Sequence, residues 1–248
     1  GTAGAIRFAA DGIDERVIVC NGDVLTDLDL ASMLEFHEAR GGEATIALTR
    51  VEDPSAFGVV PTRPDGEVIA FVEKPPPGQA PTDWINAGTY ILEPSVLARI
   101  PADLNVSIER ETFPRMLERP GRLYAIPSDA YWLDIGTPAK YAQAQRDVLL
   151  GCVGLPPAPG AEEHAPGVWV QPGARIADDA WLEAPSLIGA DAVVEPGAQV
   201  VGSVVGPGAV VGAGASLHGA VVLGGASVAA GAEVTATVVD LDAELACG

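Results

Sequence analysis

The stretch Val17-Ile-Val-Cys-Asn-Gly-Asp23 decides how this sequence folds. Four apolar residues lead directly into Asn-Gly-Asp, which predicts a buried strand that stops abruptly and presents the Asp23 carboxylate at its C-terminal end. Ligands bind outside that end of the strands in open α/β sheets. Asn-Gly-Asp is also an ordinary turn sequence, so the role of Asp23 depends on what the rest of the chain places beside it.

Strands and helices alternate on both sides of this stretch. Apolar periodicity predicts two long helices, at 30–40 and 138–150, the first capped by Asp27 or Asp29 and ended by Gly41-Gly42. Ser107 can cap a further helix that runs to Glu118. Apolar and alternating runs predict strands at 44–50, 84–92 and 123–126, and the second of these is expected to be interrupted by Asn86-Ala-Gly88. The polar residues 7–16 are predicted to be a loop. This alternation predicts an α/β domain with a mostly parallel sheet over residues 1–150.

A different pattern governs the C-terminal third of the chain. The phrase Gly-Ala-x-apolar recurs from Gly173 onward, and aliphatic anchors stand six residues apart from Val170 to Val200. Later anchors follow steps of five, six and six residues, which make a superperiod of seventeen. Such a repeat predicts a three-sided coil with one inward aliphatic residue per side, and about four coils in all. A disordered Gly/Ala-rich tail is the alternative.

Three segments follow from these two patterns. Residues 1–150 are predicted to form the α/β domain, and residues 167–248 the repeat domain. Between them, residues 151–166 are rich in proline and glycine and lack periodicity, which predicts a linker.

The net charge of −20 restricts the partners of the protein. Such a surface repels nucleic acid and anionic membranes, so neither is expected as a partner, and any phosphate site needs a metal or locally placed Lys or Arg residues. The cysteines, at 20, 152 and 247, have no short spacing, which favours a reduced, cytoplasmic protein. No long charge-free stretch of membrane length stands out.

Four short motifs of the first domain fall at strand ends or loops, and the first three have an ordinary structural explanation as well. Besides Asn21-Gly-Asp23 they are Phe57-Gly-Val59, Glu73-Lys74-Pro75 and Trp132-Leu-Asp-Ile-Gly136. Gly58 either lets a ligand approach the backbone or relieves a β-bulge. Glu73 and Lys74 either hold sugar hydroxyls and a phosphate or form a solvated pair.

Asp23 and Asp134 each end a predicted strand. Two carboxylates from separate strand ends can hold one hard cation, and Mg²⁺ takes one or two carboxylates together with substrate phosphates and water. The three histidines suggest neither a zinc site nor a Ser-His-Asp set. A magnesium site formed by Asp23 and Asp134 is therefore predicted.

Taken together, these motifs resemble the sugar-1-phosphate nucleotidylyltransferases, most closely the mannose-1-phosphate guanylyltransferases (GDP-mannose pyrophosphorylases) of the actinobacterial type. The resemblance rests on the motifs above, together with Gly1-Thr-Ala-Gly-Ala5, Phe71-Val-Glu-Lys-Pro75, Ile85-Asn-Ala-Gly88, Val106-Ser-Ile-Glu-Arg-Glu111 and Tyr131-Trp-Leu-Asp-Ile-Gly-Thr-Pro138. It implies a Rossmann-like nucleotidyltransferase sheet followed by a left-handed β-helix of hexapeptide repeats.

The resemblance also implies a role for each matching residue. Asp23 and Asp134 would bind Mg²⁺, and Lys74 would meet the sugar phosphate; these three are the predicted catalytic residues. Gly1 would lie in a loop at the nucleobase. Glu73 and Asn86 would hold sugar hydroxyls in a pocket shaped by Gly58 and Gly88. The implied reaction joins mannose-1-phosphate to GTP and releases pyrophosphate.

One departure from the family pattern shapes the alternatives. The glycine-rich loop G-G-x-G-T-R-L-x-P-x-T of the family is absent from these residues, so the sheet is expected to be N-terminally incomplete and the chain alone to lack turnover. Alternatives are a glucose-1-phosphate enzyme using UTP or dTTP, an inactive binding or assembly module, and a hexapeptide acyltransferase with His218 as its base. The flat faces and open end of a β-helix allow a homo-oligomer.

Overall fold

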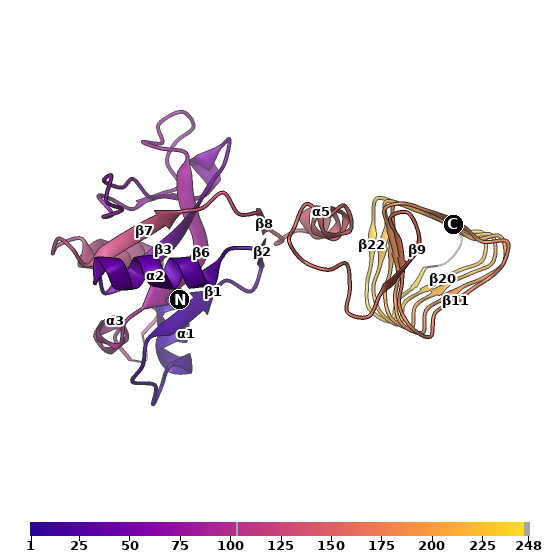
Figure 1. Cartoon of the computed structure of the whole chain (residues 1–248), viewed down its shortest axis with the longest axis horizontal. Helices are drawn as coiled ribbons and strands as arrows, with labels where there is room; N and C mark the ends of the chain where they lie inside the picture. Colours follow the sequence, from indigo (N-terminus) through magenta and orange to yellow (C-terminus); the bar gives the residue numbers. More distant parts are fainter. Residues whose placement is uncertain (103, 246–248) are drawn as a thin grey trace. The chain divides into compact units, whose positions relative to one another are not determined.

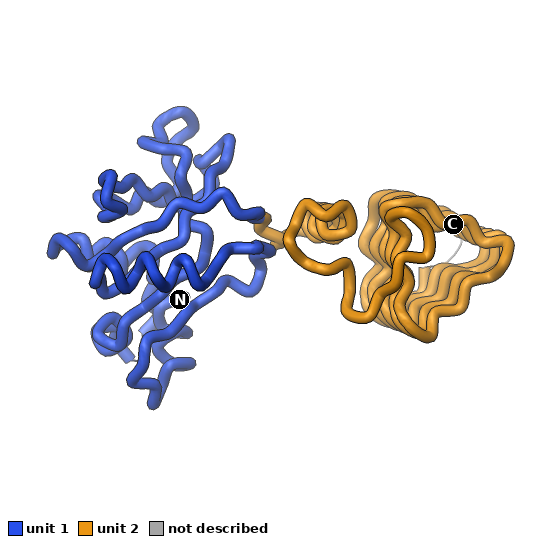
Figure 2. Tube along the Cα trace, viewed as in Figure 1, with its two compact units in different colours: residues 1–132 blue, residues 133–248 orange. Residues whose placement is uncertain are grey.

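The computed structural model describes every residue except 103 and 246–248, so Cys247 lies outside the described residues. The chain divides into two compact units, Gly1–Trp132 and Leu133–Gly248 (Figure 2). The helix α5 (Pro138–Leu149) therefore belongs to the second unit, where its Leu149 packs with Leu187, Val204 and Val221. The domain boundary at 151–166 stays a prediction.

The first unit is built on a six-stranded sheet (Figure 1). Its strands are β1 (Val17–Cys20), β3 (Ala44–Arg50), β4 (Gly58–Val59), β5 (Val72–Glu73), β6 (Trp84–Leu92) and β7 (Leu123–Pro127). The unit also holds α1 (Thr2–Ala9), α2 (Leu30–Arg40), α3 (Pro94–Arg99), α4 (Phe113–Met116), the short helices η1 (Pro54–Ala56) and η2 (Ile108–Thr112), and β2 (Val24–Thr26). The strand β8 (Trp132–Asp134) crosses the unit boundary.

The sheet of the first unit is mixed, which corrects the prediction of a mostly parallel sheet. Among the described strands of this sheet, only β3 and β7 pair in parallel, whereas β6 runs antiparallel to β1, β3 and β4. Four strands therefore share one direction: β1, β3, β4 and β7. The strand β6 runs in the reverse direction, between β3 on one side and β1 and β4 on the other. Mixed sheets of this kind are common in α/β proteins.

The strand β1 is only partly buried, which corrects the prediction of a buried strand. Val17 and Val19 pack against the core of the sheet, whereas Ile18 is 45% exposed and Cys20 is exposed. The reason is that β1 pairs with β6 alone among the described strands, so it lies at an edge of the sheet. A strand at an edge has one buried face and one solvated face.

The predicted helix at 30–40 is confirmed with both of its ends. Asp29 caps α2 by accepting hydrogen bonds from the backbone N–H groups of Ala31 and Ser32. Gly41 ends the helix in the left-handed conformation, with φ of 63°. The apolar face of α2 buries Met33 in one cluster with residues of the sheet, Ala47 and Ile91.

The N-terminal helix α1 corrects the prediction of a loop at 7–16, since Arg7, Phe8 and Ala9 are helical. Its first residues lie against the backbone around Val106: the Ala3 N–H donates to Val106 O at 3.0 Å. A side chain at Gly4 would come within 2.7 Å of Leu104 O. Tertiary packing therefore stabilises α1, which the small residues of its sequence do not predict.

The second unit contains a three-sided coil of parallel strands (Figure 1). One side is β10 (Val168–Val170), β13 (Ser186–Ile188), β16 (Val204–Val205), β19 (Val221–Val222) and β22 (Val238–Val239), with β9 (Glu162–Ala165) added antiparallel in the predicted linker. The second is β11 (Arg175–Ile176), β14 (Val193–Val194), β17 (Val210–Val211), β20 (Ser227–Val228) and β23 (Glu244–Leu245). The third is β12 (Trp181–Glu183), β15 (Gln199–Val201), β18 (Ser216–His218) and β21 (Glu233–Thr235).

The strand register confirms the predicted superperiod. Stacked partners stand eighteen residues apart in the first turn, as in Arg175 opposite Val193, and seventeen apart afterwards, as in Val193 opposite Val210. The anchors Val194, Val211 and Val228 are buried in the interior of the coil. The stack holds about five turns, against about four predicted, and it ends at β23 on the C-terminal side. No described helix is both long and apolar enough to cross a membrane.

Candidate functional site

The site forms where two strands meet along one edge of β6. The end of β1 pairs with β6 at Cys20 opposite Thr89, and β4 pairs with the same edge at Val59 opposite Ile85. Residues 86–88 of β6 lie between these two strand ends. The pairing of β6 with β3 also shifts register between Ile46 and Leu48, opposite this segment. The regular pairing of β6 is therefore interrupted where β1 ends, at the place where loops can present side chains.

Gly88 brings two of the predicted motifs into contact. Its φ is +78°, and a side chain there would come within 2.6 Å of Asn21 Nδ2. The Asn21 N–H donates to Gly88 O at 2.9 Å. The turn Asn21-Gly-Asp23 therefore packs against Asn86-Ala-Gly88, as it must if the two motifs belong to one site.

Gly58 makes room for Glu73. The two residues are cross-strand partners in β4 and β5. A side chain at Gly58 would meet the ring of Phe71 at 2.7 Å and Glu73 Oε2 at 3.2 Å. The other carboxylate oxygen of Glu73 lies 3.5 Å from the Arg110 guanidinium. The bare Gly58 backbone thus leaves room for the half-buried Glu73 carboxylate beside β4.

Lys74 follows Glu73 with an unusual backbone conformation. Its φ is +48°, a region that non-glycine residues seldom occupy and that clusters at functional sites. Its N–H donates to Phe57 O at 3.0 Å, which fixes the turn. The side chain is exposed and forms no ion pair with any described residue. An ammonium without a partner in so acidic a chain is available to an anionic ligand.

A hydrogen-bond network that the sequence did not reveal holds Asn86. The Asn86 Nδ2 group donates to Tyr90 Oη at 2.8 Å, and Asn86 Oδ1 accepts from the Gly88 N–H at 3.0 Å. The Tyr90 hydroxyl donates in turn to Glu109 Oε1 at 3.4 Å. Burial raises the pKa of Tyr90 far above its ordinary value, so its hydroxyl stays a donor. Asn86 is therefore held in one orientation before any ligand arrives.

Glu109 connects this network to the N-terminus of α1. Its Oε2 accepts hydrogen bonds from Ser107 Oγ at 2.9 Å and Thr2 Oγ1 at 3.1 Å. Gly1 precedes Thr2 at the helix cap, where a side chain would come within 2.6 Å of Asn105 Oδ1. Ser107 is a predicted helix cap, and its hydroxyl does accept the Arg110 N–H in that role. This predicted cap is the sequence feature that points to the position of Glu109. The predicted contact of Gly1 with a nucleobase stays a prediction.

The two predicted metal ligands, Asp23 and Asp134, belong to different compact units. Asp23 is exposed in the turn after β1 and forms no ion pair with a described residue. Asp134 Oδ1 accepts from the Gly136 N–H at 2.9 Å, and Oδ2 lies 3.6 Å from Lys140 Nζ. Among the described residues, no three or more His, Cys, Asp or Glu side chains gather as a metal site. Hard carboxylate oxygens suit Mg²⁺, but their pairing stays a prediction.

Comparison with known families identifies the class of protein that this fold and site define. Residues 1–150 match the family described as Nucleotidyl transferase, and residues 172–248 match the family described as GlmU-like, C-terminal hexapeptide. The chain belongs to the nucleotidyl transferase family. The second match confirms the predicted left-handed β-helix of hexapeptide repeats.

Individual relatives carry more specific names than the family does. The chain is 38% identical to the mannose-1-phosphate guanylyltransferase of Mycobacterium tuberculosis, over 82% of this chain and 56% of the relative. It is 34% identical to the UTP–glucose-1-phosphate uridylyltransferase of a Synechocystis strain, over 82% and 53%. The crystal structure of HddC from Yersinia pseudotuberculosis is 32% identical over 58% of this chain and 60% of that one, with a TM-score of 0.49. The chain spans about half the length of the curated relatives it matches.

Proposed function

We propose that the protein is a sugar-1-phosphate nucleotidylyltransferase that converts mannose-1-phosphate and GTP into GDP-mannose and pyrophosphate. The observation that carries the proposal is the arrangement of the motifs along one edge of β6: Asn21 lies against Gly88, Gly58 lies against Glu73 on the neighbouring strands, and Asn86 is held by Tyr90. The M. tuberculosis relative, named a mannose-1-phosphate guanylyltransferase, supports the choice of sugar and base.

The residues of the first unit supply binding and charge. Glu73 accepts and Asn86 donates hydrogen bonds to sugar hydroxyls, in a pocket that Gly58 and Gly88 leave open. Lys74 neutralises the sugar phosphate, whose oxygen attacks the α-phosphorus of GTP as the bond to the pyrophosphate leaving group breaks. Gly1 stands on the nucleobase side. Nucleotidyltransferases of this family typically use a divalent metal, and Mg²⁺ held by Asp23 and Asp134 would offset the charge of the triphosphate.

The free, exposed Cys20 and Cys152 suit a reducing compartment, and we place the reaction in the cytoplasm.

The test uses the full-length protein. Pyrophosphate release is measured with mannose-1-phosphate or glucose-1-phosphate, each with GTP, UTP or dTTP. The proposal expects the highest kcat/KM for mannose-1-phosphate with GTP, and a large loss in the Lys74→Gln variant. A preference for glucose-1-phosphate with UTP would reject the choice of substrate and support the alternative that the Synechocystis relative favours.

A non-catalytic binding module is a further alternative. It expects the full-length protein to bind GDP-mannose, measured by calorimetry, while releasing no pyrophosphate with any substrate pair. Turnover with any pair would eliminate this alternative.

A further inference from the structure

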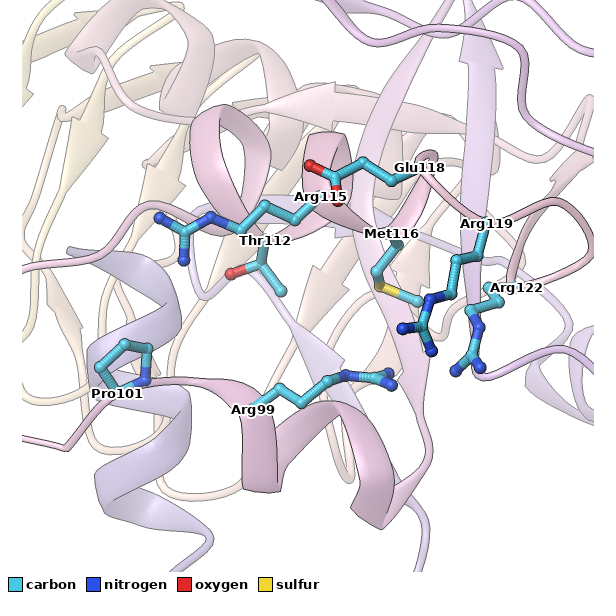
Figure 3. A pocket seen from close by; sticks show the side chains of 8 residues that line it. All are labelled: Arg99, Pro101, Thr112, Arg115, Met116, Glu118, Arg119 and Arg122. Atoms are coloured by element: carbon cyan, nitrogen blue, oxygen red, sulfur yellow. The ribbon is translucent and has the colours of Figure 1, made fainter.

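A pocket of the first unit, outside the proposed substrate site, gathers positive charge in a strongly acidic chain. The chain has 14 Lys and Arg residues against 34 Asp and Glu residues. Four of those cations line a single cavity of about 330 Å³ (Figure 3). They are Arg99, Arg115, Arg119 and Arg122. A chain whose net charge repels anions thus attracts them at this pocket.

The arginines reach the pocket from three elements. Arg99 ends α3, Arg115 lies on α4 with Arg119 just after it, and Arg122 directly precedes β7. Figure 3 shows the guanidinium groups of Arg99, Arg119 and Arg122 pointing toward one another, while Arg115 reaches the other side of the pocket. Guanidinium groups arranged in this way can hold a phosphate through several charge-assisted hydrogen bonds.

One carboxylate fixes two of these guanidinium groups from behind. Glu43 accepts hydrogen bonds from Arg99 at 2.6 and 3.1 Å and forms an ion pair with Arg122. Glu43 lines a neighbouring hollow with Arg16 and His37. It therefore orients Arg99 and Arg122 without lining the pocket itself.

The charge of the three converging arginines is not balanced. Arg119 is exposed and forms no ion pair with any described residue, whereas Arg99 and Arg122 share the Glu43 carboxylate. The three guanidinium groups therefore retain an excess of two positive charges. Glu118 also lines the pocket, but Figure 3 shows its carboxylate on the side of Arg115, away from the three guanidinium groups. A phosphate dianion carries the charge that matches this excess.

We propose that this pocket binds a small phosphate dianion, either inorganic phosphate or the phosphate group of a small monoester. The pocket shares no residue with the proposed substrate site. It is nevertheless joined to that site along the chain, because η2 carries Glu109 of the Asn86 network and continues through Thr112 into α4. The proposal does not depend on the proposed reaction.

Calorimetry on the full-length protein, without nucleotide or sugar 1-phosphate, tests the proposal. The probes are inorganic phosphate and glycerol 3-phosphate, which distinguish a free phosphate from a monoester. Saturable binding of either probe is expected, about tenfold weaker or more in Arg119→Gln, since a hydrogen bond to a charged group is lost. Arg119→Lys is expected to lie between the two, because it keeps the charge and loses the planar fork.

The matched control is Arg50→Gln. Arg50 is an exposed arginine at the end of β3, paired with Asp83, and its replacement should leave affinity unchanged. Thermal unfolding verifies that each variant is folded. Absence of saturable binding of both probes, or equal affinity in the native protein and Arg119→Gln, overturns the proposal.

Discussion

Tyr90 shows what the residue scale adds to the motifs. The motif alone predicts Asn86 as a ligand-binding residue, but its orientation depends on a tyrosine four residues later in the same strand. In a regular strand these two residues would lie about 13 Å apart. Here Asn86 and Tyr90 pair with Leu48 and Ile46, which are only two residues apart in β3, so the segment between them bulges. Sequence spacing could not predict this contact, because it depends on that irregularity.

Replacement of Tyr90 by phenylalanine tests this network. The change removes only the hydroxyl, so Asn86 loses its acceptor and Glu109 loses a donor. We expect the KM for the sugar 1-phosphate to rise about fivefold or more and the protein to lose about 1 kcal/mol of stability. The control is Tyr124→Phe in β7, which should leave KM unchanged. An unchanged KM in Tyr90→Phe would show that the network does not position Asn86.

Gly88 allows a second test at the same scale. Gly88→Ala combines a strained backbone at φ of +78° with a close contact to Asn21, whereas Gly78→Ala has φ of +73° and open space around its new methyl group. Both variants should lose about 1 kcal/mol to the left-handed backbone. Only Gly88→Ala should lose a further ~1–3 kcal/mol of stability, measured by urea unfolding, because its new methyl group would be overpacked against Asn21. Equal losses of stability in the two variants would show that the Asn21 turn shifts to accommodate the methyl group at no cost in free energy.

At the scale of elements, prediction from sequence succeeded where the signals were local. Asp29 caps α2 and Gly41 ends it, as the residues around the helix indicate. The bounds of β3 and β6 also agree with the predicted strands. By contrast α1 was missed, since contacts with the distant Val106 hold it. The direction of β6 could not be predicted either, because strand pairing depends on contacts between segments that are far apart in the sequence.

Glu43 joins three elements and makes their packing depend on pH. The guanidinium of Arg99, with Arg122 and Ser95, lowers the pKa of Glu43 from 4.5 to about 2, against the opposing effect of burial. Since the folded pKa is depressed, this stabilisation is complete above pH 4.5 and is lost as the pH falls toward 2. Glu43→Gln should therefore be less stable than the native protein at pH 7, by about 2 kcal/mol.

The difference between the two proteins should shrink as the pH falls from 4.5 to 2, measured by urea unfolding. The exposed Glu35→Gln on α2 serves as the control and should show little difference at either pH. A difference for Glu43→Gln that stays constant across this range would contradict the role assigned to its charge.

At the scale of the whole molecule, two kinds of order coexist in one chain. The first unit depends on contacts between distant segments, so its sheet order could not be derived from periodicity. The second unit repeats one pattern, and each turn contacts only its neighbours. Its register was therefore predictable from residue spacing alone, down to the change from eighteen to seventeen residues per turn.

This repeat predicts that a whole turn can be removed but a fraction of one cannot. Val204 and Val221 occupy equivalent positions in adjacent turns. Deletion of residues 204–220 removes one turn of seventeen and lets Val221 follow Ser203 as Val204 does now. Deletion of 204–219 instead shifts every later residue by one position and turns the buried anchors Val222 and Val228 toward solvent. We expect the first variant to keep its β circular dichroism and cooperative unfolding, and the second to lose both; similar behaviour of the two deletions would show that register does not hold the coil together.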